Sequence, residues 1–420
     1  LHLCDRRQRQ MCIRDRLSGN PALYKRKSMI DGGWIGTLQG EIVKRGLDLA
    51  IAFPYSSDDS PSDGDGVHYY PLYVSKWEKR FNKFRKEKID EHYIQLIRKV
   101  IDAYQPDVIH CWGSELCFGL IAKYTDIPVV MHIQGIINPI YDACCPAGMS
   151  GYSILKSLNF NFRKFYNLYY GWHSWIPYQA KREAEIFKNT HYFFGRTDWD
   201  RRVTKLLSPN AEYFFCSEAL RPAITKSEKW QYHVQKKKLL LTSTISSPVY
   251  KGADVILKAA KLLKENTDIE FEWNVYGVSE IQMQERFTGI KCLAVNVYCR
   301  GTINADQLAD RLLNSDVYMH PSYIDNSPNS VCEAQFIGLP VVAQGVGGVP
   351  TLLKDGAGVL VPSNDAYQTA YFIQKIGTNQ AFAEQLSKKE IEISKDRHDV
   401  NVIIDSIMNV YHKIVKNGTK

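Results

Sequence analysis

Two carboxylates lie eight residues apart in the stretch DNSPNSVCEAQFIGLPVVAQGV, residues 325–346. Asp325 occupies a polar loop after the apolar run DVYMH, and Glu333 lies in the helix expected after that loop. A carboxylate at the carboxyl end of a strand can accept hydrogen bonds from ligand hydroxyls, while the first amides of a helix attract a negatively charged group. The stretch therefore predicts a site for a sugar next to a phosphate. Three further polar residues are candidate contacts of this ligand: Asn326, Asn329 and Ser330.

A purely structural role is the alternative for Glu333. Ser330 and Glu333 stand in the S-x-x-E relation of a capping box, in which the Glu side chain turns back to the amide that starts its own helix. Asp325 is not covered by this alternative, because it lies in the loop before the helix. The sequence leaves both roles of Glu333 open.

A lysine at a helix start is the next chemical signal. Lys251 precedes the helix that we expect to begin at Gly252, within SSPVYKGADVILKAAKLL at 246–263. A cation at this end of a helix opposes the helix dipole. We therefore expect an anionic partner for Lys251, and the alternative is an ordinary surface lysine.

These residues are part of a longer pattern. The run from HPS at 320–322 to KDGAGVLVPSND at 354–365 resembles the donor-binding core of the glycosyltransferase family 4 enzymes, which are retaining transferases with the GT-B fold. Asp325 stands where the first of two Glu residues is usual, and Glu333 is the second. The resemblance implies that the first acid contacts the transferred sugar and that the second holds the ribose of the nucleotide. The remaining residues of the pattern are Gly338, Pro340, Gly347 and Gly348.

The stretch at 246–263 resembles the Lys-Gly segment of the same enzymes. This implies that Lys251 neutralises the diphosphate of the donor, where an ammonium would stabilise charge on the leaving group. The family usually has an Arg five residues before this Lys. Ser246 occupies that position here, so the second phosphate contact is unassigned.

Three candidate residues lie in the first half of the chain. GGWIGTLQGEIVKRG at 32–46 resembles the Gly-rich loop and first helix of these enzymes, which makes Gly32 and Gly33 candidate donor-binding residues because glycine lets backbone amides approach a phosphate. His132, at the end of VVMH, matches a position where a histidine often approaches the transferred sugar. We count it as a catalytic candidate with Asp325 and Lys251.

Neither a metal nor a redox cofactor is expected. Asp198 and Asp200 form a D-x-D, but Thr197 and Asp200 also have the spacing of a helix N-terminal cap. GVGGVP at 345–350 lacks the G-x-G-x-x-G spacing of a dinucleotide-binding loop. The only cofactor-like ligand that we expect is the nucleoside diphosphate sugar, which is a substrate.

The elements that position these residues follow from alternating apolar runs and helical segments, which are typical of βα units and parallel sheets. The expected strands of the first half lie at 47–53, 67–74, 107–111, 127–133 and 191–195. Those of the second half lie at 239–245, 269–277, 295–299, 316–320, 340–344 and 358–362.

The expected architecture is an α/β protein with the GT-B fold, in which two Rossmann-like, doubly wound parallel-sheet domains face each other across a cleft. Ligands of such sheets bind at the carboxyl ends of the strands. We expect an acceptor-binding domain at 17–225, a nucleotide-sugar donor-binding domain at 226–398, and a C-terminal helix at 399–420 that packs back on the first domain.

The start of the chain is treated separately. RQRQMCIRDR resembles a translated sequencing-adapter fragment, so we interpret residues 1–16 as non-native and exclude them from fold reasoning. A basic N-terminal tail is the alternative. The adapter interpretation predicts that the first strand of the first domain is missing.

Composition and charge limit the location. The 420 residues contain 45% hydrophobic residues but no apolar run that could span a bilayer, and the ten cysteines include no CxxC. We expect a cytoplasmic protein.

Two segments are rich in basic residues. Lys and Arg outnumber Asp and Glu at 76–99, where apolar residues recur at helical spacing, and 160–175 is aromatic and basic. These segments predict peripheral contact with an anionic membrane at its inner face, and a surface helix packed on its own domain is the alternative.

The sequence thus predicts a retaining glycosyltransferase. It would move a hexose-type residue from a UDP or GDP type of donor to a carbohydrate acceptor, including a lipid-linked one, in bacterial cell-surface polysaccharide biosynthesis. A nucleotide-sugar epimerase of the same architecture and a nucleotide-sugar-binding protein without transfer are the alternatives. The sequence predicts no nucleic-acid partner.

Overall fold

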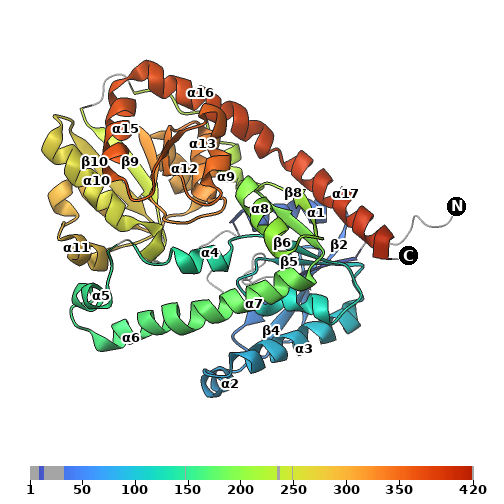
Figure 1. Ribbon diagram of the computed structural model, residues 1–420. Helices are drawn as coiled ribbons and strands as arrows, with labels where there is room; N and C mark the ends of the chain where they lie inside the picture. Colours follow the sequence, from blue (N-terminus) through green and yellow to red (C-terminus); the bar gives the residue numbers. More distant parts are fainter. Residues whose placement is uncertain (1–8, 14–32, 147, 234–236, 248, 419–420) are drawn as a thin grey trace.

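Two α/β units make up the molecule, each with helices on both faces of one sheet (Figure 1). The computed structural model describes residues 9–13, 33–146, 148–233, 237–247 and 249–418, with side chains described up to residue 416. Near-continuous apolar runs form the central strands, since a parallel sheet covered on both faces buries every side chain. We therefore expect the functional residues at the ends of the strands.

The first sheet has eight strands in the order β3-β4-β2-β1-β5-β6-β7-β8. All neighbouring strands are parallel except the edge pair of β3 and β4, which is antiparallel. The strand bounds are β1 Arg9–Ile13, β2 Asp48–Tyr55, β3 Ser62–Gly64, β4 Val67–Tyr73, β5 Val108–Trp112, β6 Val129–His132, β7 Tyr192–Gly195 and β8 Glu212–Phe215.

The second sheet has six parallel strands in the order β11-β10-β9-β12-β13-β14. Counted within this domain, the order is 3-2-1-4-5-6, which is that of dinucleotide-binding doubly wound sheets. The direction of winding reverses between β9 and β12, so a crevice is expected at the carboxyl ends of these two strands. The bounds are β9 Leu239–Thr244, β10 Phe271–Tyr276, β11 Val297–Gly301, β12 Val317–His320, β13 Val341–Gln344 and β14 Val359–Val361.

The structure corrects the expectation for the start of the chain. Residues Arg9–Ile13 form β1 at the centre of the first sheet, where they pair in parallel with β2 and β5. The apolar run MCI is fully buried and contributes side chains to both faces of the sheet. A first strand is therefore present, and the segment cannot be left out of the fold. The non-native origin of residues 1–16 stays a hypothesis.

All eleven strands expected from the sequence are present, within two residues of their predicted ends. Besides β1, the sequence analysis missed β8 and the three-residue edge strand β3. β3 lies inside the polar run 56–66, which we expected to be a loop. Short polar edge strands lack the apolar alternation by which strands are recognised.

The helices of the first domain pack on the two faces of its sheet. α3, η1 and α7 cover one face, while α1 and α17 cover the other. The bounds are α1 Gly33–Lys44, α2 Lys76–Phe81, α3 Lys86–Tyr104, η1 Cys117–Lys123, α4 Ile137–Asp142, α5 Gly151–Ser157, α6 Phe162–Tyr170, η2 Gly171–Trp175, α7 Ile176–Asn189 and α8 Asp198–Leu207. The next helix, α9 Pro222–Thr225, already packs in the core of the second domain.

The second domain buries one continuous apolar core around its sheet. Its helices and short turns are η3 Val249–Lys251, α10 Ala253–Asn266, α11 Gln282–Thr288, η4 Leu293–Val295, α12 Ala305–Leu313, α13 Asn329–Ile337, α14 Val349–Leu352, η5 Lys354–Gly356, α15 Ala366–Thr378 and α16 Gln380–Arg397. The last helix, α17 Val400–Gly418, continues from α16 and crosses to the first domain (Figure 1).

Helix α17 ties the two domains together. Ile404, Ile407 and Tyr411 are buried in the apolar cluster that includes Trp34 and Phe194 of the first domain. The chain therefore crosses twice between the domains, once before β9 and once between α16 and α17. Within the described residues, no helix is both long and apolar enough to cross a membrane.

Candidate active site

A cavity of about 430 Å³ lies between the domains, at the carboxyl ends of strands from both sheets. The second domain contributes the ends of β9 and β12, which are the strands of its topological switch point. The first domain contributes the residues that follow β5, β6 and β7. The lining residues are Trp34, Glu115, Gln134, Gly135, Ile136, Ile140, Arg196, Trp199, Thr244, Ile245, Ser246, Tyr250, Lys251, His320, Ile324, Asp325, Asn326, Ser327, Pro328, Asn329 and Ser330.

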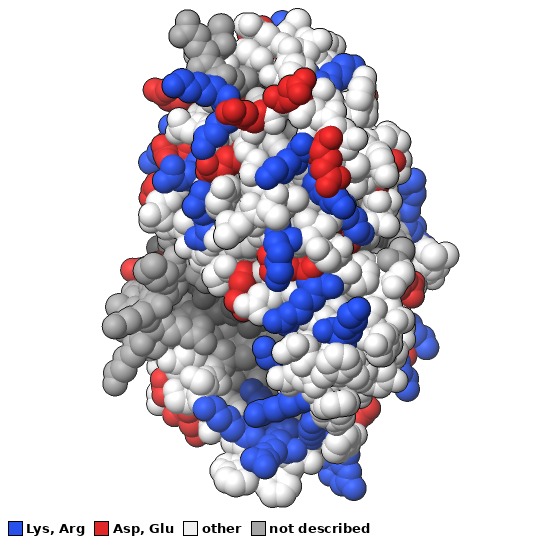
Figure 2. Space-filling view, turned by 90° about the vertical axis from the view of Figure 1, so that its left-hand side faces the viewer, with Lys and Arg blue, Asp and Glu red and all other residues white. Residues whose placement is uncertain are grey.

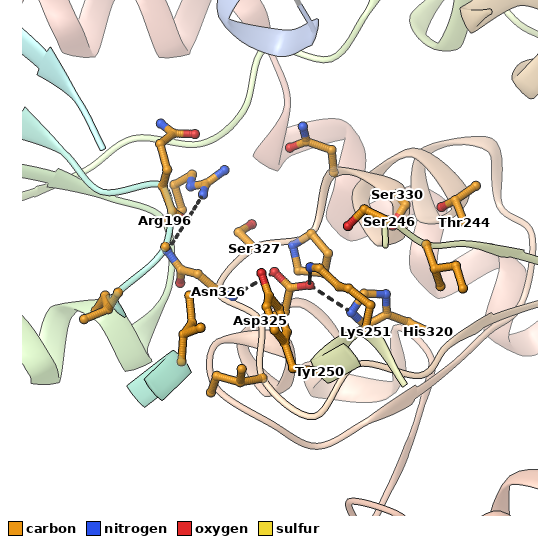
Figure 3. Close-up of a pocket in the computed structure, with 18 of the residues that line it drawn as sticks. Arg196, Thr244, Ser246, Tyr250, Lys251, His320, Asp325, Asn326, Ser327 and Ser330 are labelled. Atoms are coloured by element: carbon orange, nitrogen blue, oxygen red, sulfur yellow. Dashed lines mark hydrogen bonds and ion pairs between the residues drawn. The ribbon is translucent and has the colours of Figure 1, made fainter. Parts of the chain in front are cut away.

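Three charged or titratable side chains meet on the donor-domain wall. Lys251 Nζ lies 2.6 Å from Asp325 Oδ2, and His320 Nε2 lies 3.3 Å from the same oxygen. In Figure 3, dashed lines join Asp325 to both of the other side chains. Two of the three predicted catalytic residues are thus in direct contact, and His320 is an addition that the sequence analysis did not make.

The two charges stabilise each other. Burial alone would raise the pKa of Asp325, but the ammonium of Lys251 and the contact with His320 outweigh it and hold this pKa well below its ordinary value. Burial likewise lowers the pKa of Lys251, and Asp325 outweighs it, so that the lysine pKa lies above its ordinary value. Both groups are therefore ionised at neutral pH, and an incoming anion would share the ammonium with Asp325.

A glycine sets the position of Lys251. Lys251 ends the turn η3, and Gly252 is the N-cap of α10 with φ +73°. A Cβ at Gly252 would lie 1.8 Å from the carbonyl oxygen of Pro321, in the segment that leads from β12 to Asp325. The Lys-Gly pair thus brings the lysine and the acid loop together because only glycine allows this close approach.

The Gly-Gly loop supports Asp325 from the other side. Gly347 has φ +52°, and a Cβ there would lie 2.1 Å from the carbonyl oxygen of Asp325. The amide of Gly348 donates a hydrogen bond of 3.0 Å to the same oxygen. The glycines that the sequence pattern singled out therefore hold the backbone of the acid loop.

Glu333 does not form a capping box. The N-cap of α13 is Pro328, without a side-chain hydrogen bond, and Glu333 turns away from the helix start. Its carboxylate accepts two hydrogen bonds from Arg221, from Nε at 2.8 Å and from Nη2 at 2.9 Å. Burial raises the pKa of Glu333, and Arg221 counteracts this rise. The structure thus removes the capping alternative and supplies a different partner, in the segment between the two domains.

The other predicted residues of the acid loop line the cavity. Asn329 and Ser330 form the first turn of α13, whose leading amides have no acceptor within the helix. Asn326 is buried and bridges the domains, since its Oδ1 accepts a 2.7 Å hydrogen bond from Thr197 and its Nδ2 donates one of 2.8 Å to Asp200. Asn326 therefore holds the two walls of the cavity together.

His132 is not brought to the cavity. It is fully buried beneath Trp34, whose ring centroid lies 5.2 Å from the imidazole, and it stacks on Trp112 at 4.6 Å. Burial, with His110 and Arg196 nearby, lowers the pKa of His132 well below its ordinary value, so the ring is neutral. This corrects the expectation of direct sugar contact: Trp34 lines the cavity, and His132 supports Trp34 from behind.

The Gly-rich loop contributes less than expected. Gly32 lies outside the described residues. Gly33 starts α1 with φ +57° and does not line the cavity, whereas its neighbour Trp34 does. The predicted approach of the Gly33 backbone to a phosphate stays a prediction.

The first domain provides polar groups that the sequence analysis missed. Arg196 follows β7, donates a 2.6 Å hydrogen bond to the carbonyl of Gln134, and pairs with buried Glu218 at 2.8 Å. Glu115 follows β5 and accepts a 3.1 Å hydrogen bond from the amide of Gly135. Each of these side chains stands just after a predicted strand, so the rule that sites lie at strand ends could have found them.

The described residues offer one group that could hold a metal ion, formed by Glu218, Cys332 and His398. Their ligand atoms lie within 4.8 Å of one another, and all three residues are buried. Arg196 and Arg397 lie 2.8 and 3.7 Å from the Glu218 carboxylate, however. Two guanidinium charges already balance this carboxylate and would repel a cation.

The D-x-D stretch is a helix start. Thr197 caps α8, with its hydroxyl accepting from the amide of Asp200 and the Asp200 side chain accepting from the amide of Thr197. Asp200 also accepts hydrogen bonds from Tyr213 and Asn326. The predicted cap is confirmed, and the carboxylate is fully used by protein donors.

The second domain matches a known family. Residues 225–392 match the family model described as "Glycosyl transferases group 1". A curated relative, "D-inositol 3-phosphate glycosyltransferase" of Paenarthrobacter aurescens (strain TC1), is 35% identical over 117 residues, which are 26% of this chain and 28% of that protein. The matched stretch thus spans less than a third of the length of that relative.

Solved structures resemble the chain over nearly its whole length. The sucrose-phosphate synthase (tll1590) from Thermosynechococcus elongatus has a TM-score of 0.73 at 15% identity, covering 98% of this chain and 100% of that one. Anabaena Alr3699/HepE, solved in complex with UDP and glucose, has a TM-score of 0.61 at 13% identity, covering 97% and 100%. At these identities the likeness shows the fold, and the expected two-domain GT-B architecture is confirmed.

Proposed function

We propose that this chain is a retaining group 1 glycosyltransferase that moves a hexose-type sugar from a nucleoside diphosphate sugar to a hydroxyl of a carbohydrate acceptor. The observation that carries the proposal is the pair of Lys251 and Asp325, at the switch point of a doubly wound sheet and beside the N-terminus of α13. An ammonium and helix amides attract a diphosphate, and a carboxylate accepts hydrogen bonds from sugar hydroxyls. The matched family model supports the same reaction.

The residues have distinct roles in this proposal. Lys251, with the first amides of α13 near Asn329 and Ser330, stabilises the negative charge that develops on the departing diphosphate. Asp325 orients the transferred sugar. Glu333 binds the ribose of the nucleotide, and its carboxylate is then shared between the ribose and Arg221. We assign no covalent nucleophile. The reaction then depends on placing the leaving group and the acceptor hydroxyl on the same face of the sugar.

The donor side supports UDP as the first nucleotide to test, because the Anabaena protein of similar fold was solved with UDP and glucose. GDP is the alternative. We propose that transfer needs no metal, since Lys251 and helix amides take the part that a divalent cation plays on a diphosphate.

The acceptor side is the domain with Glu115, Gln134 and Arg196 at the cavity wall. We propose membership of glycosyltransferase family 4 and a place in bacterial cell-surface polysaccharide biosynthesis. The acceptor would then be lipid-linked, with the protein in the cytoplasm and in peripheral contact with the inner membrane face.

The first experiment is a thermal shift of the purified chain with UDP, GDP and NAD. A ligand that binds only the folded state at 100 times its Kd stabilises that state by about 2.7 kcal/mol. We expect a shift with UDP or GDP but not with NAD, and a smaller shift for Lys251→Ala. Lys261→Ala is the matched control, since Lys261 lies on α10, is half-exposed, and does not line the cavity.

Product analysis then tests the reaction. Incubation with the donor and a panel of saccharide acceptors should release the nucleoside diphosphate and form an α- or β-glycoside with the donor's anomeric configuration. Interconversion of the sugar without an acceptor would instead identify an epimerase. Tight nucleotide binding without transfer would identify a binding protein, an outcome that Ser246 and the Asp in place of Glu make worth testing.

A further inference from the structure

Two helices of the first domain are rich in aromatic residues yet bury none of them. α2 has the sequence KWEKRF and α6 has FRKFYNLYY, and neither contains a buried residue. Trp77, Phe81 and Phe84 are 69, 80 and 76% exposed, and Phe162 is 70% exposed. Aromatic side chains normally bury large areas in a core, so their gathering on a surface indicates a partner.

The fold brings these two helices together although about 80 residues separate them. Lys83, just after α2, places its Nζ 5.4 Å from the ring centre of Tyr166 and 4.7 Å from that of Tyr170. Lys86 donates hydrogen bonds of 2.7 and 2.9 Å to the carbonyl and hydroxyl of Ser174. Trp175 lies 5.5 Å from the same ammonium. The aromatic residues therefore form one surface with lysines between them.

This surface is strongly basic. Residues 76–88 contain seven Lys and Arg against two Glu, and residues 160–175 contain two more basic residues and no acidic one. Figure 2 shows Lys and Arg side chains gathered at the lower end of the molecule, where α2 and α6 lie in Figure 1. Basic residues around protruding aromatic rings are the arrangement by which proteins bind an anionic lipid interface.

We propose that α2, α6 and the turns that follow them form a docking surface for an anionic lipid bilayer. We call the residues 76–86 and 160–175 the aromatic-basic surface. Trp77, Phe81, Phe84 and Phe162 enter the interface between headgroups and acyl chains, while the lysines and arginines contact lipid phosphates. This inference deepens the peripheral membrane contact of the proposed function by assigning it to one face, but lipid binding itself does not depend on glycosyl transfer.

The surface is connected to the candidate active site by the segment 136–176. Ile136 and Ile140, at the start of this segment, line the cavity. Near its end, Trp172 packs with Cys144, Ile154 and Val249, and Val249 belongs to the same short turn as the predicted catalytic lysine. The aromatic-basic surface is thus joined to the cavity by residues that also pack on the turn of Lys251.

The most exposed rings distinguish a bilayer from an acidic polysaccharide. Phe81, Phe84 and Phe162 carry no polar atom and could not hydrogen-bond to sugar hydroxyls, whereas they gain free energy when their rings leave water. The position of phenylalanines at the outermost points of a basic surface therefore favours lipid over polysaccharide.

The test is co-sedimentation of the purified full chain with vesicles of phosphatidylcholine alone or mixed with phosphatidylglycerol. We expect binding that requires phosphatidylglycerol and that added salt weakens. One variant combines Trp77→Ser, Phe81→Ser and Phe84→Ser, and a second combines Lys76→Glu and Arg80→Glu. Each variant should lose at least about tenfold in binding, the first because its rings no longer leave water and the second because two positive charges at the anionic surface are reversed.

A matched control changes exposed residues of the same types elsewhere. The control variant combines Tyr367→Ser with Lys261→Glu. Tyr367 is 76% exposed on α15, and Lys261 lies on α10. This variant should bind like the wild type. All variants should keep the wild-type Tm and the nucleotide thermal shift, since they remove no buried side chain; this separates loss of docking from loss of the proposed catalytic function.

Three results would overturn the inference. Equal binding to pure phosphatidylcholine would remove the role of charge, and unchanged binding by both surface variants would place the lipid contact elsewhere. Binding to soluble polygalacturonate but not to vesicles, with the same dependence on the two surface variants, would identify an acidic polysaccharide as the partner.

Discussion

Lys251 and Asp325 form an ion pair of 2.6 Å although 74 positions separate them in the chain. Lys251 follows β9 and Asp325 follows β12, and these strands are hydrogen-bonded neighbours because the sheet reverses its winding between them. The pair is therefore a product of the strand order. It places one positive and one negative group where a doubly wound sheet binds its ligand.

Removal of the ammonium should impair turnover. We expect Lys251→Ala to lower kcat by about 10²- to 10³-fold, because a preorganised charge on the leaving group is lost. Steady-state release of the nucleoside diphosphate measures this, with Lys261→Ala as the control. A Lys251→Ala enzyme with wild-type kcat would take the lysine out of the mechanism.

The two members of the pair should also be coupled. Lys251→Ala leaves the carboxylate of Asp325 without its cation, so we expect a lower Tm for this variant than for the double variant Lys251→Ala with Asp325→Asn. Thermal unfolding of the two single variants and the double variant gives the coupling. Additive changes in Tm would mean that the ion pair does not stabilise the folded protein.

Glu333 has two candidate roles that mutation can separate. If its carboxylate serves only Arg221, then Glu333→Ala and Arg221→Ala should lower Tm alike and leave the Kd of the nucleotide unchanged. If it also binds the ribose, Glu333→Ala should raise that Kd by about tenfold or more, since one charged hydrogen bond contributes about 1.5–3 kcal/mol. We expect the second result, and calorimetric titration with the nucleotide decides between them.

Gly252 should tolerate no side chain. A Cβ there would lie 1.8 Å from the Pro321 carbonyl oxygen, and φ is +73°. We expect Gly252→Ala to lower Tm and to abolish the nucleotide thermal shift, because the lysine and the acid loop must move apart. The control is Gly36→Ala within α1, where a Cβ meets no atom within 4 Å. That change should stabilise the protein by about 0.5–1 kcal/mol. Equal effects of the two substitutions would contradict the argument.

Stability should respond to pH through Glu390. This carboxyl is fully buried on α16 and accepts a 2.9 Å hydrogen bond from the amide of Val341, and burial raises its pKa well above the ordinary value. A raised folded-state pKa means that the group's contribution to stability is complete below the unfolded-state pKa and is lost as pH rises through the folded-state pKa.

Glu390→Gln keeps the accepting oxygen and removes the ionisation. The free energy of unfolding of the variant, relative to the wild type, should therefore increase from pH 5 to pH 8, by about 1.4 kcal/mol per pH unit until the folded-state pKa is reached. Urea unfolding at both pH values measures the difference. A difference that is the same at pH 5 and pH 8 would show that folding does not raise the pKa of Glu390 into this range.

The fold was predictable in most of its parts because the strands of covered parallel sheets are short apolar runs. DVYMH and PVVAQ are clear examples, and both became fully buried strands. The edge strand β3 and the segment at Arg9–Ile13 were missed for different reasons. β3 is polar, and the other segment was set aside because of its resemblance to an adapter fragment.

The residues of the candidate site were predictable where a short sequence pattern places a functional residue directly after a strand. Asp325, Lys251 and Ser330 line the cavity, as their positions after strands suggested. His132 failed as a direct contact because the residue at the end of β6 points beneath Trp34. Nothing within a single strand specifies which neighbouring side chain covers it.

The sequence by itself determined the two sheets, the glycines at Gly252 and Gly347, and the residue types of the donor wall, because these depend on apolar periodicity and on local backbone conformation. Only the tertiary structure decided that Glu333 pairs with Arg221, that Asn326 joins the domains, and that the surfaces of α2 and α6 meet. Each of these contacts joins residues from distant parts of the chain. Their distances depend on strand order and domain packing, which no local pattern contains.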